Sequence, residues 1–338
     1  MHPRLKTVED QVIVITGASS GIGLVTAKMA AARGARVVLV ARNETDLRRA
    51  VEGIRRNGGR AIFVAADVAL PEEADRIAGE AIREYGRIDT WVNNAAVAVY
   101  GRLMDLPIPD MRRQLDVNYW GQVYGSRAAV PHLRREGGAL INVASALADR
   151  AIPLQGNYSA AKHALKAFTD SLRMELEEAE APISVTLIKP GSIDTPLFDK
   201  ARTLLGVEPQ PVPPVYAPEL VARTILVCAE RPVRDVVVSG MGKVLSLAGR
   251  MAPRLTDRFM ERSTFQSQKT DRPVTAGRPD NLYAPVEHDG GERGKNWTGR
   301  VHKRSMQTAA ALHPGVTAAV ITLLLGAGLA GAVARNRR

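Results

Sequence analysis

The feature that most constrains the fold is a glycine-rich segment directly after a short apolar run near the N-terminus. Residues Gln11–Ile15 are mostly β-branched and apolar, as expected of a buried strand. The segment TGASSGIG follows at residues 16–23, and a helical pattern then continues to Gly34. A glycine turn between a strand and a helix lets the backbone approach a pyrophosphate at the helix N-terminus. The segment therefore predicts a dinucleotide-binding unit.

Strand and helix patterns then alternate along the chain with short connections. The predicted strands are 36–40, 61–65, 88–92, 139–143, 183–188 and 236–238, and the predicted helices are 43–57, 71–85, 110–135, 158–178 and 218–229. Such alternation predicts a doubly wound parallel sheet of the Rossmann type, with about seven strands and helices on both faces.

The charge of the chain is concentrated near its C-terminal end. The net charge is +11 over 338 residues, and residues 241–338 hold 16 Lys and Arg against 7 Asp and Glu. A basic tail is typical of a membrane-surface or nucleic-acid partner, and the apolar segment that ends the chain favours the membrane over nucleic acid. The single cysteine, Cys228, excludes an internal disulfide. The first ten residues have no apolar run, so we expect no signal peptide.

Tyr158 and Lys162 are four residues apart and therefore share one face of the predicted helix. An ammonium group beside a phenol favours the phenolate and brings the pKa of the phenol toward neutral pH. The pair is consistent with a proton-transfer site. Taken alone, the pair proves little, because a surface pair on an amphipathic helix has the same spacing.

With these motifs taken together, the chain resembles the short-chain dehydrogenase/reductases over roughly residues 8–242. The resemblance rests on several motifs in the family's order, and Ser145 precedes Tyr158 by the family's usual separation. The motifs are TGASSGIG at 16–23, Asp67-Val68, NNAA at 93–96, Asn118, Ser145, YSAAK at 158–162 and PGSIDT at 190–195.

The resemblance implies a catalytic tetrad of Asn118, Ser145, Tyr158 and Lys162. Tyr158 would exchange a proton with the substrate oxygen, and Ser145 would hold that oxygen. Lys162 would lower the pKa of the phenol and bind the nicotinamide ribose, while Asn118 would support a water relay to Lys162. We expect no metal site.

The resemblance also implies the cofactor contacts. Those expected are Gly17, Ser19, Ser20, Gly21, Ile22, Gly23, Asp67, Val68, Asn94, Tyr158, Lys162, Ile193 and Thr195. The sequence departs from the family at Ala96, where glycine is usual, and the added methyl group would tighten the space beside the cofactor.

The choice of cofactor can be argued from charge. An NAD-preferring Rossmann domain carries an acidic residue about 20 residues past the glycines, where it binds the ribose 2′-hydroxyl. Here the second strand ends in Ala41-Arg42. A guanidinium pairs with a 2′-phosphate, whereas a carboxylate would repel it. Arg42 therefore favours NADP(H) over NAD(H), although it could also be a solvated loop arginine.

The expected substrate pocket is mainly apolar and favours a small apolar carbonyl or alcohol, which could be aliphatic, steroid-like or aromatic. Its expected lining residues are Val97, Val99, Tyr100, Ala146, Leu147, Leu154, Leu197 and Phe198.

The tail after Gly242 lies outside the resemblance. Residues Lys243–Arg262 have the spacing of a basic amphipathic helix, which Pro253 would bend. Such a helix can lie at a membrane surface, or it can pack against the core or a second subunit. Gln266–Asn296 predicts an irregular linker. Val316–Ala334 is uncharged and long enough to span a bilayer, although a buried helix is the alternative.

We therefore expect three parts: a catalytic domain (1–242), a helix and linker (243–313), and a transmembrane helix with a basic end (314–338). The predicted function is an NADP(H)-dependent oxidoreductase, membrane-associated through a C-terminal single-pass anchor, with its catalytic domain in the cytoplasm. The family also makes a homo-oligomer possible. The alternatives are an NAD-dependent dehydrogenase on the same scaffold and a non-enzymatic, cofactor-binding membrane-associated protein.

Overall fold

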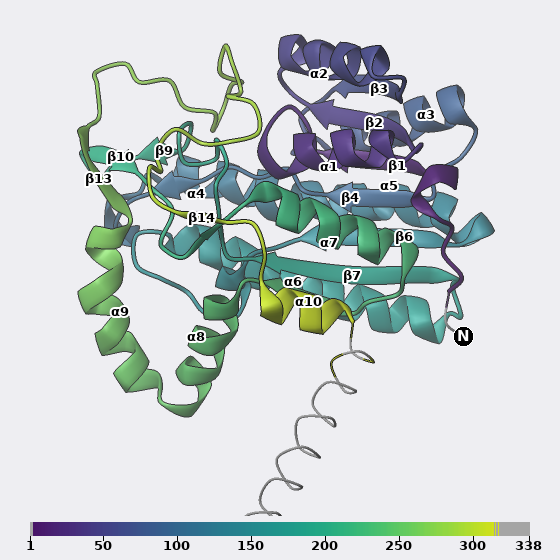
Figure 1. Ribbon diagram of the computed structural model, residues 1–338. Coiled ribbons are helices and arrows are strands. Elements are labelled where there is room, and N and C mark those ends of the chain that lie inside the picture. The colour runs from purple at the N-terminus through teal and green to yellow at the C-terminus, as the bar shows by residue number, and fades with distance from the viewer. Residues whose placement is uncertain (1–2, 314, 316, 318–338) are drawn as a thin grey trace, which may run out of the picture.

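A seven-stranded parallel sheet forms the centre of the protein in the computed structural model, which describes residues 3–313, 315 and 317 (Figure 1). Every strand pairs in parallel with its neighbours. This agrees with the predicted Rossmann-type fold. The strand order is β12 (Asp235–Val238), β7 (Ile183–Pro190), β6 (Gly138–Val143), β4 (Thr90–Asn93), β1 (Val12–Thr16), β2 (Arg36–Ala41) and β3 (Arg60–Ala65).

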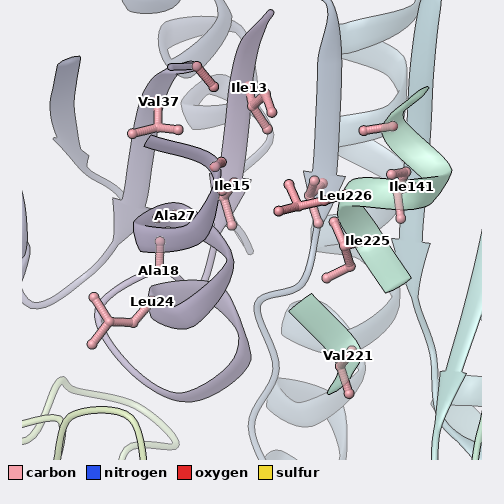
Figure 2. Close-up of a cluster of buried hydrophobic side chains, with 14 of the residues drawn as sticks. Ile13, Ile15, Ala18, Leu24, Ala27, Val37, Ile141, Val221, Ile225 and Leu226 are labelled. Atoms are coloured by element: carbon pink, nitrogen blue, oxygen red, sulfur yellow. The ribbon is translucent and has the colours of Figure 1, made fainter. Parts of the chain in front are cut away.

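Helices cover both faces of the sheet because successive strand residues point to opposite sides. Ile13 and Ile15 of β1 pack on one face, while Val14 packs on the other. Figure 2 shows the first of these cores, in which β1 meets side chains of two helices. The first face carries α1 (Gly21–Ala32), α2 (Glu44–Arg56) and α7 (Pro218–Glu230), and the second carries α3 (Pro71–Tyr85), α5 (Gly121–Glu136) and α6 (Gly156–Glu178).

The helix predicted over 110–135 is divided in the structure. It consists of α4 (Ile108–Leu115), a π-helical turn η3 (Asp116–Trp120) and α5. A π turn inserts one extra residue into the helical hydrogen-bond ladder and often occurs at functional sites. Asn118 lies within this turn.

Short strands outside the main sheet pair with one another, and most of them come from the C-terminal half of the chain. They join segments far apart in sequence, such as β10 and β13, which pair antiparallel. The pairings are β5 (Val99–Tyr100) with β9 (Arg202–Thr203), β10 (Val207–Pro209) with β13 (Lys269–Pro273), and β8 (Ser192–Ile193) with β11 (Val215–Tyr216) and β14 (Val301–His302). Part of the predicted irregular linker is therefore the strand β13.

The predicted amphipathic helix over 243–262 is two helices that form a projecting hairpin (Figure 1). They are α8 (Gly240–Met251) and α9 (Pro253–Ser267), separated by Ala252 in a non-helical conformation. Proline is tolerated best in the first turn of a helix, where its missing N–H group is not needed. The chain therefore begins a new helix at Pro253. A further helix, α10 (Met306–Leu312), packs beside β12 and α8.

The apolar stripe expected on this hairpin faces outward. The α9 side chains that pack inward are Thr256, Met260 and Thr264. The exposed apolar side chains of the hairpin are Val244, Leu247, Met251, Leu255 and Phe259.

The predicted membrane-associated location requires correction. Among residues 3–313, 315 and 317, no helix combines the length and apolar character needed to cross a bilayer. The longest, α6, carries charged residues along its length, and α8 and α9 have only 12 and 15 residues. This finding contradicts the predicted single-pass anchor. The segment on which the prediction rested, Val316–Ala334, lies outside the described residues except for Thr317.

Candidate active site

One cavity of about 300 Å³ brings the glycine turn and the predicted catalytic residues together. It lies along the ends of β1, β4 and β6, where ligands bind in open parallel sheets. Its wall includes Ser145, Tyr158 and Lys162. Of the predicted cofactor contacts, the lining contains Gly17, Ser19, Ser20, Gly21, Ile22, Arg42, Asp67, Val68, Asn94, Ile193 and Thr195 in addition to Tyr158 and Lys162.

The glycine turn takes a shape that other residues rarely adopt. Gly17 and Gly21 have φ values of 68° and 53°, in the left-handed region. A Cβ atom on Gly23 would lie 2.2 Å from the carbonyl oxygen of Gly17, so Gly23 allows the helix to start against the turn. Gly23 does not line the cavity itself and acts through this packing.

Asn94 holds the glycine turn in place. Its Nδ2 atom donates to the carbonyl oxygens of Thr16, at 2.9 Å, and Gly17, at 3.3 Å. The hydroxyl of Thr16 accepts in return from the backbone N–H groups of Asn94 and Ala95. These bonds join the ends of β1 and β4 and fix the floor of the cavity.

Tyr158 and Lys162 lie one turn apart on α6 and are both buried. The Nζ atom of Lys162 is 5.6 Å from the centre of the Tyr158 ring and donates to the carbonyl oxygen of Val143 at 3.0 Å. Ser145 follows the end of β6, and its hydroxyl accepts from the N–H of Leu147. The structure therefore brings three members of the predicted tetrad to one wall.

The pKa values of this pair differ from the expectation. Burial raises the pKa of Tyr158 to about 12, and a hydrogen bond with Ser145 acts in the opposite direction. Burial lowers the pKa of Lys162 to about 7. Desolvation disfavours the charged form of each group, and the phenol is therefore protonated at neutral pH. Burial is the main influence on the pKa of the Tyr158 phenol in this structure.

Asn118, the fourth predicted tetrad residue, does not line the cavity. Its side-chain amide binds both backbone groups of Val97: Nδ2 donates to the carbonyl oxygen, and Oδ1 accepts from the N–H, each at 2.9 Å. Val97 does line the cavity. The side chain of Asn118 therefore supports the substrate wall from behind.

Arg42 lies at the cavity wall but already has partners. Its Nη1 atom donates to the carbonyl oxygen of Tyr283 at 3.0 Å, and its Nη2 atom donates to that of Asn281. Asp67 pairs with Arg113 and lies 4.0 Å from Arg42. Burial lowers the pKa of Arg42, and Arg113 adds to this effect while Asp67 opposes it.

The apolar lining was predicted in part. Val97, Tyr100, Ala146, Leu147, Leu197 and Phe198 line the cavity, whereas Val99 and Leu154 are buried elsewhere. Val99 packs in a neighbouring core with Leu106 and Val117.

Sequence reasoning missed Lys200, a largely buried cation beside the glycine turn. Its Nζ atom donates to the Ser20 hydroxyl at 3.0 Å and to the Asp289 carboxylate at 2.7 Å. Asn281, Pro285 and Asp289 also line the cavity, although they come from the predicted linker. No local motif marks these residues, because the contacts of Asp289 join positions 89 or more residues apart.

Comparisons with known proteins agree with this geometry. Residues 11–205 match the short chain dehydrogenase family. The uncharacterized oxidoreductase YxnA of Bacillus subtilis (strain 168) is 48% identical over 327 residues, covering 95% of this chain and 91% of that protein. An 11-beta-hydroxysteroid dehydrogenase of Pinus massoniana is 37% identical over 234 residues, covering 65% of this chain and 64% of that protein.

The fold is also similar to that of an alcohol dehydrogenase from the archaeon Thermococcus sibiricus, solved in complex with 5-hydroxy-NADP. The TM-score is 0.60 at 23% identity, with 67% of this chain and 95% of that chain covered. The family match and the identity to YxnA carry the assignment. The chain therefore belongs to the short-chain dehydrogenase family and is an oxidoreductase of that type, acting on hydroxyl or carbonyl groups.

Proposed function

We propose that the protein is an NADP(H)-dependent oxidoreductase of apolar carbonyl or alcohol substrates, with Tyr158 as the proton donor and acceptor. The observation that carries this proposal is the placement of Tyr158, Ser145 and Lys162 on one wall of the cavity that begins at the glycine turn. Residues 1–242 form the catalytic domain in this proposal, and residues 243–313 contribute further residues to the cavity wall.

The residues present fit a nicotinamide dinucleotide. A Cβ atom on Gly23 would collide with the backbone of Gly17, so only glycine allows this close approach. Gly17 and Gly21 form the turn at the N-terminus of α1. Such a turn presents backbone N–H groups to a pyrophosphate. The cofactor supplies the hydride when it is bound.

Each tetrad member then has a defined task. The protonated phenol of Tyr158 donates its proton to a carbonyl oxygen, and the Ser145 hydroxyl binds the same oxygen. Lys162, whose pKa is lowered to about 7 by burial, can exchange a proton near neutral pH. Asn118 positions Val97, and any relay through Asn118 must use its backbone, because its side chain already binds Val97.

The preference for NADP(H) rests on charge. The second strand ends in Ala41-Arg42 without a carboxylate of its own, and Arg42 is held at the cavity wall. The complex with 5-hydroxy-NADP reported for the structural neighbour is consistent with this choice. Asp67 is the nearest opposing charge, and its pairing with Arg113 reduces its effect on a bound phosphate.

The substrate class follows from the mainly apolar lining, with Leu147, Leu197 and Phe198 beside Tyr158. The name of the Pinus massoniana relative indicates a hydroxysteroid substrate for that protein. We therefore place steroid-like and other bulky apolar carbonyls first in a substrate screen.

The test is a screen of apolar carbonyls with NADPH and NADH, using the full chain and the variant Tyr158→Phe. Loss of the phenol should lower kcat/KM by about 1,000-fold, within the usual range for general acid–base catalysis, while NADPH binding is retained. Tyr85→Phe, far from the cavity on α3, is the matched control. Carbonyl reduction that survives in Tyr158→Phe would refute the assigned role.

The cofactor preference is tested separately with Arg42→Asp. The ratio of kcat/KM for NADPH to that for NADH should fall by about 100-fold, because the attraction of the guanidinium for the 2′-phosphate is replaced by repulsion from a carboxylate. The ratio isolates the 2′-phosphate, since other consequences of losing Arg42 affect both cofactors alike. An unchanged ratio would remove Arg42 from the explanation.

A further inference from the structure

A segment of the C-terminal region crosses the cofactor side of the cavity. We call residues 281–294 the strap. Asn281, Pro285 and Asp289 of the strap line the same cavity as the glycine turn and Tyr158. The strap therefore forms part of the wall of this cavity.

Both ends of the strap are fixed to the body of the protein. At its start, Leu282 is fully buried in the core that contains Val97 and Val117. At its end, Arg293 pairs with Glu219 at 2.6 Å and with Asp194 at 3.4 Å. These two anchors set where the strap begins and ends.

The middle of the strap is held mainly through its backbone. The side chain of Asn43 donates to the carbonyl oxygens of Val286, at 2.8 Å, and Glu287, at 3.3 Å. The N–H of Gly21, the first residue of α1, donates to the carbonyl oxygen of Gly291 at 2.8 Å. Side chains from Tyr283 to His288 are exposed or partly exposed, so little apolar area holds this part closed.

Asp289 is the buried side chain in the second half of the strap. Its carboxylate pairs with Lys200 at 2.7 Å, and its N–H donates to Asp46 at 2.5 Å. Lys200 in turn donates to Ser20 in the glycine turn. Breaking one partner of a buried ion pair leaves the other charge uncompensated, which is costly. The Lys200–Asp289 pair is therefore a side-chain contact that opposes opening.

We propose that the strap encloses the bound dinucleotide and that the Lys200–Asp289 pair acts as its latch, so that opening of the strap controls cofactor release. This inference rests on the proposed function. The cofactor would lie between the sheet and the strap, along the route from Arg42 to Tyr158. Release past α1 and the end of β2 then requires the strap to leave Asn43, Arg42 and Gly21.

The test is the rate of NADPH release from the full chain, measured by a fluorescence chase, for Asp289→Asn. The latch predicts release at least 10-fold faster and a correspondingly weaker Kd. Charge alone predicts the opposite sign, because removing a carboxylate beside an anionic cofactor should tighten binding. Slower release, tighter binding or an unchanged rate in this variant would each overturn the proposal.

Glu292→Gln is the matched control. It removes one negative charge from the same strap, but its partner Lys28 is exposed, so the release rate should change less than about 2-fold. A 10-fold effect in this control would also overturn the latch, because strap charge would then explain the result. Thermal melting of both variants checks that they are folded.

Hydrogen exchange on the unmodified chain provides a measurement that needs no variant. Bound NADPH should slow exchange in the peptide spanning residues 281–294 at least 10-fold, with little change in α9. Failure of NADPH and NADH to bind at all would refute the proposed function. Tight binding with an unprotected strap would refute only the enclosure.

Discussion

The sheet region (residues 11–239) and the C-terminal region (residues 240–313) are built on different principles. In the sheet region, apolar side chains alternate along strands and fill two continuous cores. In the C-terminal region, buried apolar residues are few, and contacts such as those of Arg42 and Asp289 are polar and join distant positions. The first region therefore provides the stability, while the second completes the wall of the site.

The largest effect should come from the core of the sheet. Leu140→Ala, at a fully buried position in β6, should lower the free energy of unfolding by about 3 kcal/mol, because it removes apolar contacts and leaves a cavity. Both regions should then unfold together in denaturant. Leu70→Ala, at a side chain that is 46% exposed, should stay within about 0.5 kcal/mol of the unmodified protein.

A core substitution in the C-terminal region should have a smaller and more local effect. Met260→Ala, in α9, should cost about 2 kcal/mol, at the low end for such changes, because Met260 is buried but lies outside the two cores of the sheet. Hydrogen exchange should increase in α8 and α9 but not in the strands. The neighbouring Phe259→Ala, at an exposed position, is the control. Equal loss of protection in β6 and α9 would break the distinction between the regions.

The third prediction compares Lys162, which is fully buried, with Lys200, whose side chain is 12% exposed. Lys162 in the sheet region has its pKa lowered by burial alone, to about 7, whereas Asp289 opposes the same effect at Lys200. Between pH 7 and 10.5 the unfolded state therefore binds more protons at Lys162 than the folded state does. The free energy of unfolding should rise with pH in this window, by at most about 1.4 kcal/mol per pH unit.

Lys162→Met should remove this rise, whereas Lys28→Met, at an exposed position, should leave it intact. Denaturant titrations across the pH window measure both slopes. A rise that persists in Lys162→Met would show that another group causes it.

Much of the sheet region could be predicted because its signals are local. The β-branched run of β1, the glycine turn and the Tyr158–Lys162 spacing each lie within a few residues, and the Rossmann-type sheet followed from them. The break at η3 was missed, since no proline or glycine marks Asp116–Trp120. The raised pKa of Tyr158 was missed because spacing shows a neighbouring ammonium but not the burial that desolvates it.

The strap could not be predicted from local sequence. Its composition is typical of a linker, and its bonds use mainly backbone carbonyl groups, which any residue provides. Arg42 was identified from its position after β2, but its bonds to residues about 240 positions away were not foreseeable. The role of Lys200 likewise depends on its contacts with Ser20 and Asp289, which its local sequence does not indicate.

The strap also bears on how the protein should be produced for study. A chain shortened at residue 280 would leave Arg42 and Lys200 at the cavity without the carbonyl oxygens and the carboxylate that now face them. The site would then display unbalanced positive charge and collect buffer anions such as phosphate or sulfate. Apparent cofactor affinity would come to depend on the buffer. Truncation is therefore an unsuitable route to a minimal enzyme, even though the family match covers only residues 11–205.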